Sequence, residues 1–119
     1  MLRIDPSDAI PIWKQIEEGV QHLVATGTLG PDDAVASVRE LARELRVNPL
    51  TVSKAFQFLI DAGLVESRRG MGNFVLPGAT QKARTLARER FLAETWPHVA
   101  KRIEQLGLSV PDLLKERDA

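Results

Sequence analysis

The feature that most constrains the fold is a pair of short helical patterns separated by about three residues. Residues 37–45 (SVRELAREL) have the apolar spacing of a helix, and Ser37 followed by Glu40 forms a capping box at its start. Residues 48–62 repeat this spacing, with Asn48 suited to the N-cap and Pro49 to the first helical position. Two short helices joined this closely must meet at a tight angle, which predicts a helix-turn-helix unit.

The segments on either side of this unit predict one more helix and a β-hairpin. Residues 11–26 carry apolar side chains at three- and four-residue steps, which indicates a helix that ends at Gly27. Residues 64–76 (LVESRRGMGNFVL) change to a β-like pattern interrupted by glycines. Three helices followed by a hairpin is the element order of a winged helix-turn-helix. The expected fold class is therefore mainly α with a β-hairpin wing, over residues 1–76.

The Gly-x-Gly at residues 70–72 has three possible roles: a phosphate-cradling loop, a hairpin turn or a spacer. It precedes Asn73-Phe74-Val75, which is strand-like, so a nucleotide-binding loop lacks the helix that it requires. We interpret the glycines as the tip of the wing, where they allow positive φ. Side chains alternate along a strand, so only one of Arg68 and Arg69 should face a bound partner.

Residues 77–119 predict a helical tail. Apolar side chains recur there at steps of four, three, four and three, a heptad-like seam. Pro97 falls within it, so either Thr95 caps a new helix or the helix kinks, and Ser109 with Asp112 caps a last short helix. So short a tail has little else on which to bury this stripe, which favours a homodimer interface over packing against the winged domain. The predicted dimerisation residues are Leu92, Trp96, Val99, Ile103 and Leu106.

Composition excludes several classes of protein. The chain has no Cys, and its two His are far apart; no catalytic Ser/His/Asp set, metal-ligand spacing or P-loop occurs. We therefore expect no enzyme, no metal and no cofactor. No signal peptide or membrane-length apolar segment is seen, so we expect a cytoplasmic protein without a membrane partner. The net charge of zero argues weakly against nucleic-acid binding, but residues 34–76 carry six basic and four acidic side chains.

From Pro11 to Leu76 the sequence resembles the DNA-binding domain of the GntR family of bacterial transcription regulators. The matching segments occur in the family's order: PIWKQI, SVRELARELRV, TVSKAFQFLIDAGLV and RGMGNFV. Asn48-Pro49 ahead of Thr51-Val52, together with the short tail, resembles the YtrA-type subfamily. Members of that subfamily lack a large effector domain and dimerise through a short helical C-terminal segment.

The resemblance implies a homodimeric DNA-binding transcriptional regulator, most simply a repressor, that reads a pseudo-palindromic operator in double-stranded DNA. The second helix of the helix-turn-helix would enter the major groove, and the wing would touch the backbone or minor groove. It also implies control of its own operon, often with transporter genes. The sequence names no small-molecule effector. The residues that the resemblance places on DNA are Ser37, Arg39, Asn48, Pro49, Leu50, Thr51, Ser53, Lys54, Arg69 and Gly70.

Some positions depart from the family pattern. Ala36 stands where the family usually has Pro, which loosens the loop before the second helix. Leu50 stands where the subfamily often has Asn, so it either meets a thymine methyl or loses a base contact. The neutral net charge keeps one alternative open, a protein-interaction module that uses the winged fold without DNA. The polar start of the third helix and the basic wing argue against that alternative.

Overall fold

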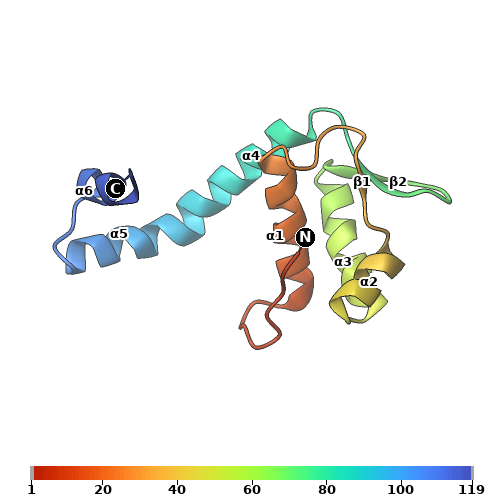
Figure 1. The fold of residues 1–119 in the computed structure, drawn as a ribbon, viewed down its shortest axis with the longest axis horizontal. Coiled ribbons are helices and arrows are strands. Elements are labelled where there is room, and N and C mark those ends of the chain that lie inside the picture. The colour runs from red at the N-terminus through yellow and green to blue at the C-terminus, as the bar shows by residue number, and fades with distance from the viewer. Residues whose placement is uncertain (1, 119) are drawn as a thin grey trace. The chain divides into compact units, whose positions relative to one another are not determined.

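The computed structural model describes residues 2–118 and divides the chain into two compact units, Met1–Ala87 and Arg88–Ala119 (Figure 1). The predicted class, mainly α with a β wing and C-terminal helices, is confirmed. The first unit holds α1 (Ile12–Ala25), β1 (Ala34–Val35), α2 (Val38–Leu45), α3 (Pro49–Asp61), β2 (Val65–Arg68), β3 (Gly72–Val75) and most of α4 (Ala79–Arg90). The second holds the end of α4, the π-helical turn η1 (Phe91–Thr95), α5 (Trp96–Gln105) and α6 (Val110–Asp118).

The wing belongs to a three-stranded antiparallel sheet in the order β1-β3-β2. Sequence reasoning predicted only the β2–β3 hairpin and missed β1. With two residues, β1 is too short to show an alternating pattern, and its neighbours are acidic. The position of β1 depends on hydrogen bonds to residues far away in the sequence. The Asp32 N–H donates to the Val75 carbonyl (2.8 Å), and the Val75 N–H donates to the Asp33 carbonyl (3.0 Å).

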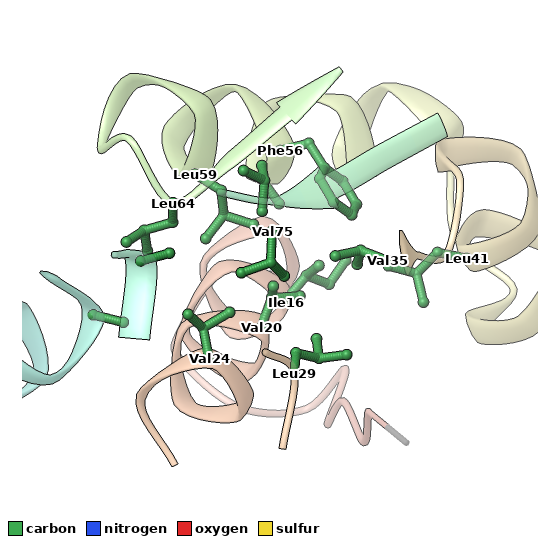
Figure 2. Packing of buried hydrophobic residues seen from close by; sticks show 14 of the residues in the cluster. Ile16, Val20, Val24, Leu29, Val35, Leu41, Phe56, Leu59, Leu64 and Val75 are labelled. Atoms are coloured by element: carbon green, nitrogen blue, oxygen red, sulfur yellow. The ribbon is translucent and has the colours of Figure 1, made fainter. Parts of the chain in front are cut away.

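The core of the first unit is formed by α1, α3 and the sheet, with the other elements completing it. Figure 2 shows side chains from α1 directed toward those from α3 and β3. Burying an aliphatic or aromatic side chain of this size stabilises a fold by roughly 1.5–3 kcal/mol each. This core holds the helix-turn-helix and the base of the wing in one unit. Its largest fully buried side chains are Ile16, Leu41, Leu59, Leu64, Val20, Val24, Val52, Val65 and Val75.

The first two turns of α4 also pack into this unit. Ala79 and Ala83 are fully buried, and their small side chains let the helix approach closely. The Arg84 guanidinium donates to the Ala25 carbonyl through Nη2 (3.1 Å) and Nε (3.3 Å). A cation bound to the last carbonyls of α1 complements the negative end of that helix.

The end of α2 uses a left-handed residue that is not glycine. Arg46 has φ +57° and ψ +48°, and the following Val47 N–H donates to the Ala42 carbonyl (3.0 Å). This is the Schellman arrangement, in which the left-handed position is usually glycine. By contrast, the left-handed residue that follows α3 is Gly63, with φ +75°, as its sequence predicted. The sharp turn between α2 and α3 therefore carries local backbone strain at Arg46.

The tail helix neither breaks at Pro97 nor starts again at Thr95. Thr95 has helical dihedrals and makes no side-chain cap, so of the two alternatives open from the sequence, the cap at Thr95 does not occur. The chain instead passes through η1, where the Trp96 N–H donates to the Phe91 carbonyl five residues back. Pro97 has no N–H to offer the Ala93 carbonyl, and a wider turn absorbs that loss. The same turn brings the Phe91 and Trp96 rings to a centroid distance of 6.4 Å.

Candidate nucleic-acid interface

The start of α2 is closed by Ser37. Its hydroxyl accepts from the Glu40 N–H and donates to the Glu40 carboxylate, both at 3.2 Å. The cap was predicted correctly, but the carboxylate meets the hydroxyl and not the Ser37 backbone amide. The first intrahelical bond runs from the Leu41 N–H to the Ser37 carbonyl (2.9 Å), so the amides of Val38 and Arg39 precede the hydrogen-bonded ladder. Arg39 is exposed beside this amide-rich, positively polarised end.

The start of α3 presents a short row of side chains that the fold does not use. The Asn48 carboxamide oxygen accepts from the Leu50 N–H (2.9 Å), which confirms the N-cap, and Pro49 occupies the first turn. Leu50 is 76% exposed. Ser53 is also exposed, whereas Thr51 is half-buried. This end of α3 is therefore rigid in its backbone and open in its side chains.

Lys54 has a partner within the fold. Its ammonium lies 4.5 Å from the centroid of the Trp13 ring, and Trp13 stacks on Phe58 with centroids 4.6 Å apart. Lys54 and Phe58 are four residues apart and so share one side of α3. A cation over an aromatic ring near the surface contributes about 0.5–1 kcal/mol. This attraction holds the Lys54 ammonium toward Trp13 on α1. Sequence reasoning missed this cluster, although the four-residue spacing within α3 was visible.

The two wing arginines have different surroundings. Arg68 pairs with Asp32 (2.8 Å) and Glu66 (3.0 Å), and its guanidinium lies 4.2 Å from the centroid of the Phe74 ring. The hydrogen bonds that Arg68 donates to Asp32 and Glu66 raise the pKa of Arg68 above its ordinary value. Arg69 is exposed and makes no such contact with the described residues. Strand β2 ends at Arg68, so Arg69 lies in the turn, and strand alternation is not what separates the two side chains.

The wing turn has the glycine geometry that the sequence predicted. The Met71 N–H donates to the Arg68 carbonyl (2.9 Å), which closes a tight turn. Gly70 has φ +75° and Gly72 has φ +99°, both in the range that favours glycine. A Cβ added at Gly72 would lie 4.0 Å from the Ser37 Cβ, so the start of α2 adjoins the base of the wing turn. The hairpin itself projects from the body of the unit (Figure 1).

Across residues 2–118, no group of three or more His, Asp and Glu side chains is arranged to hold a metal ion. The helices in the same range include none with the length and apolar character needed to cross a bilayer. The candidate interface consists of the exposed start of α3, the capped start of α2 and the wing turn.

Three helices, a tight α2–α3 turn and a projecting hairpin define the class as winged helix-turn-helix. The family model described as "Bacterial regulatory proteins, gntR family" matches residues 13–75, and the chain belongs to this family. The chain is 40% identical over 79 residues to the HTH-type transcriptional repressor YtrA of Bacillus subtilis. That match covers 66% of this chain and 61% of the repressor, so the chain spans less than two thirds of its length.

Solved structures show the same architecture. A GntR family transcriptional regulator from Listeria monocytogenes is 25% identical, covers 97% of both chains and superposes with a TM-score of 0.71. The DNA-binding domain of AraR, solved in complex with its operator ORE1, is 27% identical with a TM-score of 0.54. That match covers 63% of this chain and 92% of the AraR domain. Sequence and fold thus agree on the GntR family, and the relatives named here are described as transcription regulators.

Proposed function

We propose that the chain is a homodimeric repressor that binds a pseudo-palindromic operator, with α3 in the major groove and the wing on the backbone or minor groove. The observation that carries this proposal is the start of α3, where the backbone is capped while Leu50 and Ser53 remain exposed. An α-helix fits the width of the major groove, and a helix N-terminus lets short side chains reach base edges. The similar AraR domain was solved in complex with its operator, which supports binding of operator DNA by this domain.

The proposed roles follow from the surroundings of each residue. Ser37 and Arg39 bind phosphate at the start of α2, where free amides favour an anion. Arg69 and Gly70 contact the backbone or minor groove, because Arg69 carries the wing charge that no described acidic side chain pairs with. Lys54 contributes less, since its ammonium is held over Trp13. The base-reading positions of α3 are Asn48, Pro49, Leu50, Thr51 and Ser53.

The second unit supplies the dimer interface in this proposal. Its helices leave Leu92, Val99 and Leu106 exposed, while Trp96 and Ile103 are half-buried. An apolar surface of this extent on a small unit is typical of a protein–protein interface. Phe91 joins the predicted set, because η1 brings its ring near Trp96. Two copies joined in this way would present two α3 helices to two half-sites.

The biological setting is part of the same proposal. The chain represses its own operon, as the YtrA-type resemblance implies, and it acts in the cytoplasm without a metal or cofactor. Operons of that subfamily often include transporter genes. The repressor named among its relatives supports repression rather than activation. No effector is assigned.

The test is selection of binding sites from a random duplex pool with the full chain, followed by affinity measurements on the selected site. We expect an inverted repeat to be enriched. Arg39→Ala should weaken binding by about 1.5–3 kcal/mol for each half-site, the worth of a hydrogen bond to a charged group, and flatten the salt dependence, because a phosphate contact is lost. Lys54→Ala should have a smaller effect.

The matched control is Lys82→Ala, which removes the same charge from an exposed position. Its Nζ lies 3.0 Å from a Cβ built on Gly63, beyond the far end of α3 and about 20 Å from the helix start. This variant should bind normally. Unchanged affinity in Arg39→Ala would remove that residue from the interface. Failure to enrich any sequence would favour the protein-interaction module instead, which the zero net charge keeps as the second candidate.

A further inference from the structure

Leu50 is the most exposed large apolar side chain in the described part of the chain, at 76%. It lies in the first turn of α3, and its own backbone N–H is held by the Asn48 side chain at 2.9 Å. The backbone that carries it is therefore fixed, while the side chain contributes almost nothing to the core. A partner that covers the Leu50 side chain would remove its apolar surface from water, and this burial would favour binding.

The chemistry around Leu50 limits what α3 can read. The helix contains no arginine, and its one basic side chain, Lys54, is held over the Trp13 ring. The bidentate arginine contact that commonly selects guanine is therefore absent from α3. Ser53 lies one turn further along the exposed side, and a serine hydroxyl can hydrogen-bond to several bases, so it would discriminate little between them. The Asn48 carboxamide oxygen accepts from the Leu50 N–H and is therefore engaged in the cap. This leaves the apolar Leu50 as the exposed side chain at the start of α3 with a distinct base preference.

We infer that Leu50 is a specificity-determining residue that contacts the C5-methyl group of a thymine in each operator half-site. The inference rests on the proposed function, in which the start of α3 enters the major groove. The thymine methyl is the only apolar group that a base pair presents in that groove. Contact with it covers the Leu50 side chain and removes one methyl group from water at the same time.

The experiment uses deoxyuridine, which lacks only that methyl group. The full chain first selects a site from a random duplex pool, and each thymine of the selected site is then replaced singly by deoxyuridine. We expect one replacement in each half-site to lower affinity about fourfold, the worth of one buried methyl-sized group. In Leu50→Ala the same replacement should change affinity by less than about 1.5-fold, because the partner of the methyl is gone. Leu50→Asn should enrich adenine at that position, since Asn pairs with adenine.

Met71→Ala is the matched control. Met71 is also exposed, at 68%, but it lies in the wing turn, so this variant should keep the deoxyuridine effect. Both positions are exposed, and equal thermal melting of the variants and the parent chain verifies that they fold. Three results overturn the inference: a selected half-site without thymine, a site indifferent to every deoxyuridine, or the same deoxyuridine effect in Leu50→Ala. Failure to select any site overturns the proposed function instead, so the two failures are distinguishable.

Discussion

At the scale of single residues, Arg68 and Arg69 show how adjacent, identical side chains take different roles. Arg68 is neutralised by Asp32 and Glu66 and stacked on Phe74, which ties the wing to the loop before β1. Arg69 is exposed in the turn. The first stiffens the wing, and the second is available to a phosphate.

These surroundings predict different responses to salt. Arg69→Ala should reduce the slope of log affinity against log salt by about 1 for each half-site, because one phosphate contact is lost. Arg68→Ala should leave that slope nearly unchanged and cost only a small loss of affinity from a looser wing. Titrations of the selected operator at several salt concentrations measure both slopes. Equal changes in slope for the two variants would contradict the assignment.

At this scale the sequence predicts some residues better than others. The caps at Ser37 and Asn48 were predictable, because capping depends on residues within three positions along the chain. The partner of Arg68 could not be predicted, because Asp32 lies 36 residues away in the sequence and comes close only in the folded sheet. The role of Lys54 was hidden for the same reason, because Trp13 belongs to another helix.

At the scale of elements, the end of α2 stores strain that a single substitution can release. Arg46 adopts φ +57°, a conformation that costs an L-residue about 1–2 kcal/mol and costs glycine almost nothing. Arg46→Gly should therefore stabilise the first unit by about 0.5–1 kcal/mol, after the greater entropy of glycine in the unfolded chain is subtracted. A melt followed by circular dichroism should shift upward by a few degrees.

Arg43→Gly provides the control for this substitution. It removes the same side chain from the interior of α2, where the dihedrals are helical, and should destabilise the unit by about 1 kcal/mol. A fall in melting temperature for Arg46→Gly would mean that its side chain, rather than its backbone, determines the stability at this turn.

At the scale of elements, the long helices could be predicted from the sequence, whereas the shortest elements could not. Helices α1, α2 and α3 were predictable because each has a full apolar stripe and recognisable ends. Strand β1 and turn η1 were not. Two residues carry no periodicity, and a proline inside a helical pattern is compatible with a break, a kink or a wider turn.

At the scale of the whole molecule, the proposed homodimer makes a direct prediction. The chain should sediment as a dimer at micromolar concentration, and Val99→Glu should raise the dimer dissociation constant at least about tenfold by placing a charge in the interface. Lys101→Glu is the control: it introduces the same side chain about 200° around α5 from Val99. Monomeric parent chain, or unchanged association in Val99→Glu, would contradict the proposal.

What the sequence could establish at this scale is the class of protein. Its matched segments and their order were sufficient for the family, and the family model and the fold confirm it. The operator and its half-site spacing could not be predicted, because both depend on a second copy of the chain and on DNA. For the operator sequence, the exposed Leu50 at the start of α3 makes one specific prediction, a thymine in each half-site.

The turn at Phe91–Thr95 has a geometric consequence for how such a regulator diverges. A π-helical turn is an ordinary α-turn with one residue added. Because the wider turn takes up the added residue, the helix keeps nearly the same phase on either side of it. Loss of that residue would therefore convert η1 into an ordinary α-turn and shorten the tail by one position. The predicted dimerisation side chains after the turn, from Trp96 to Leu106, would keep their common face.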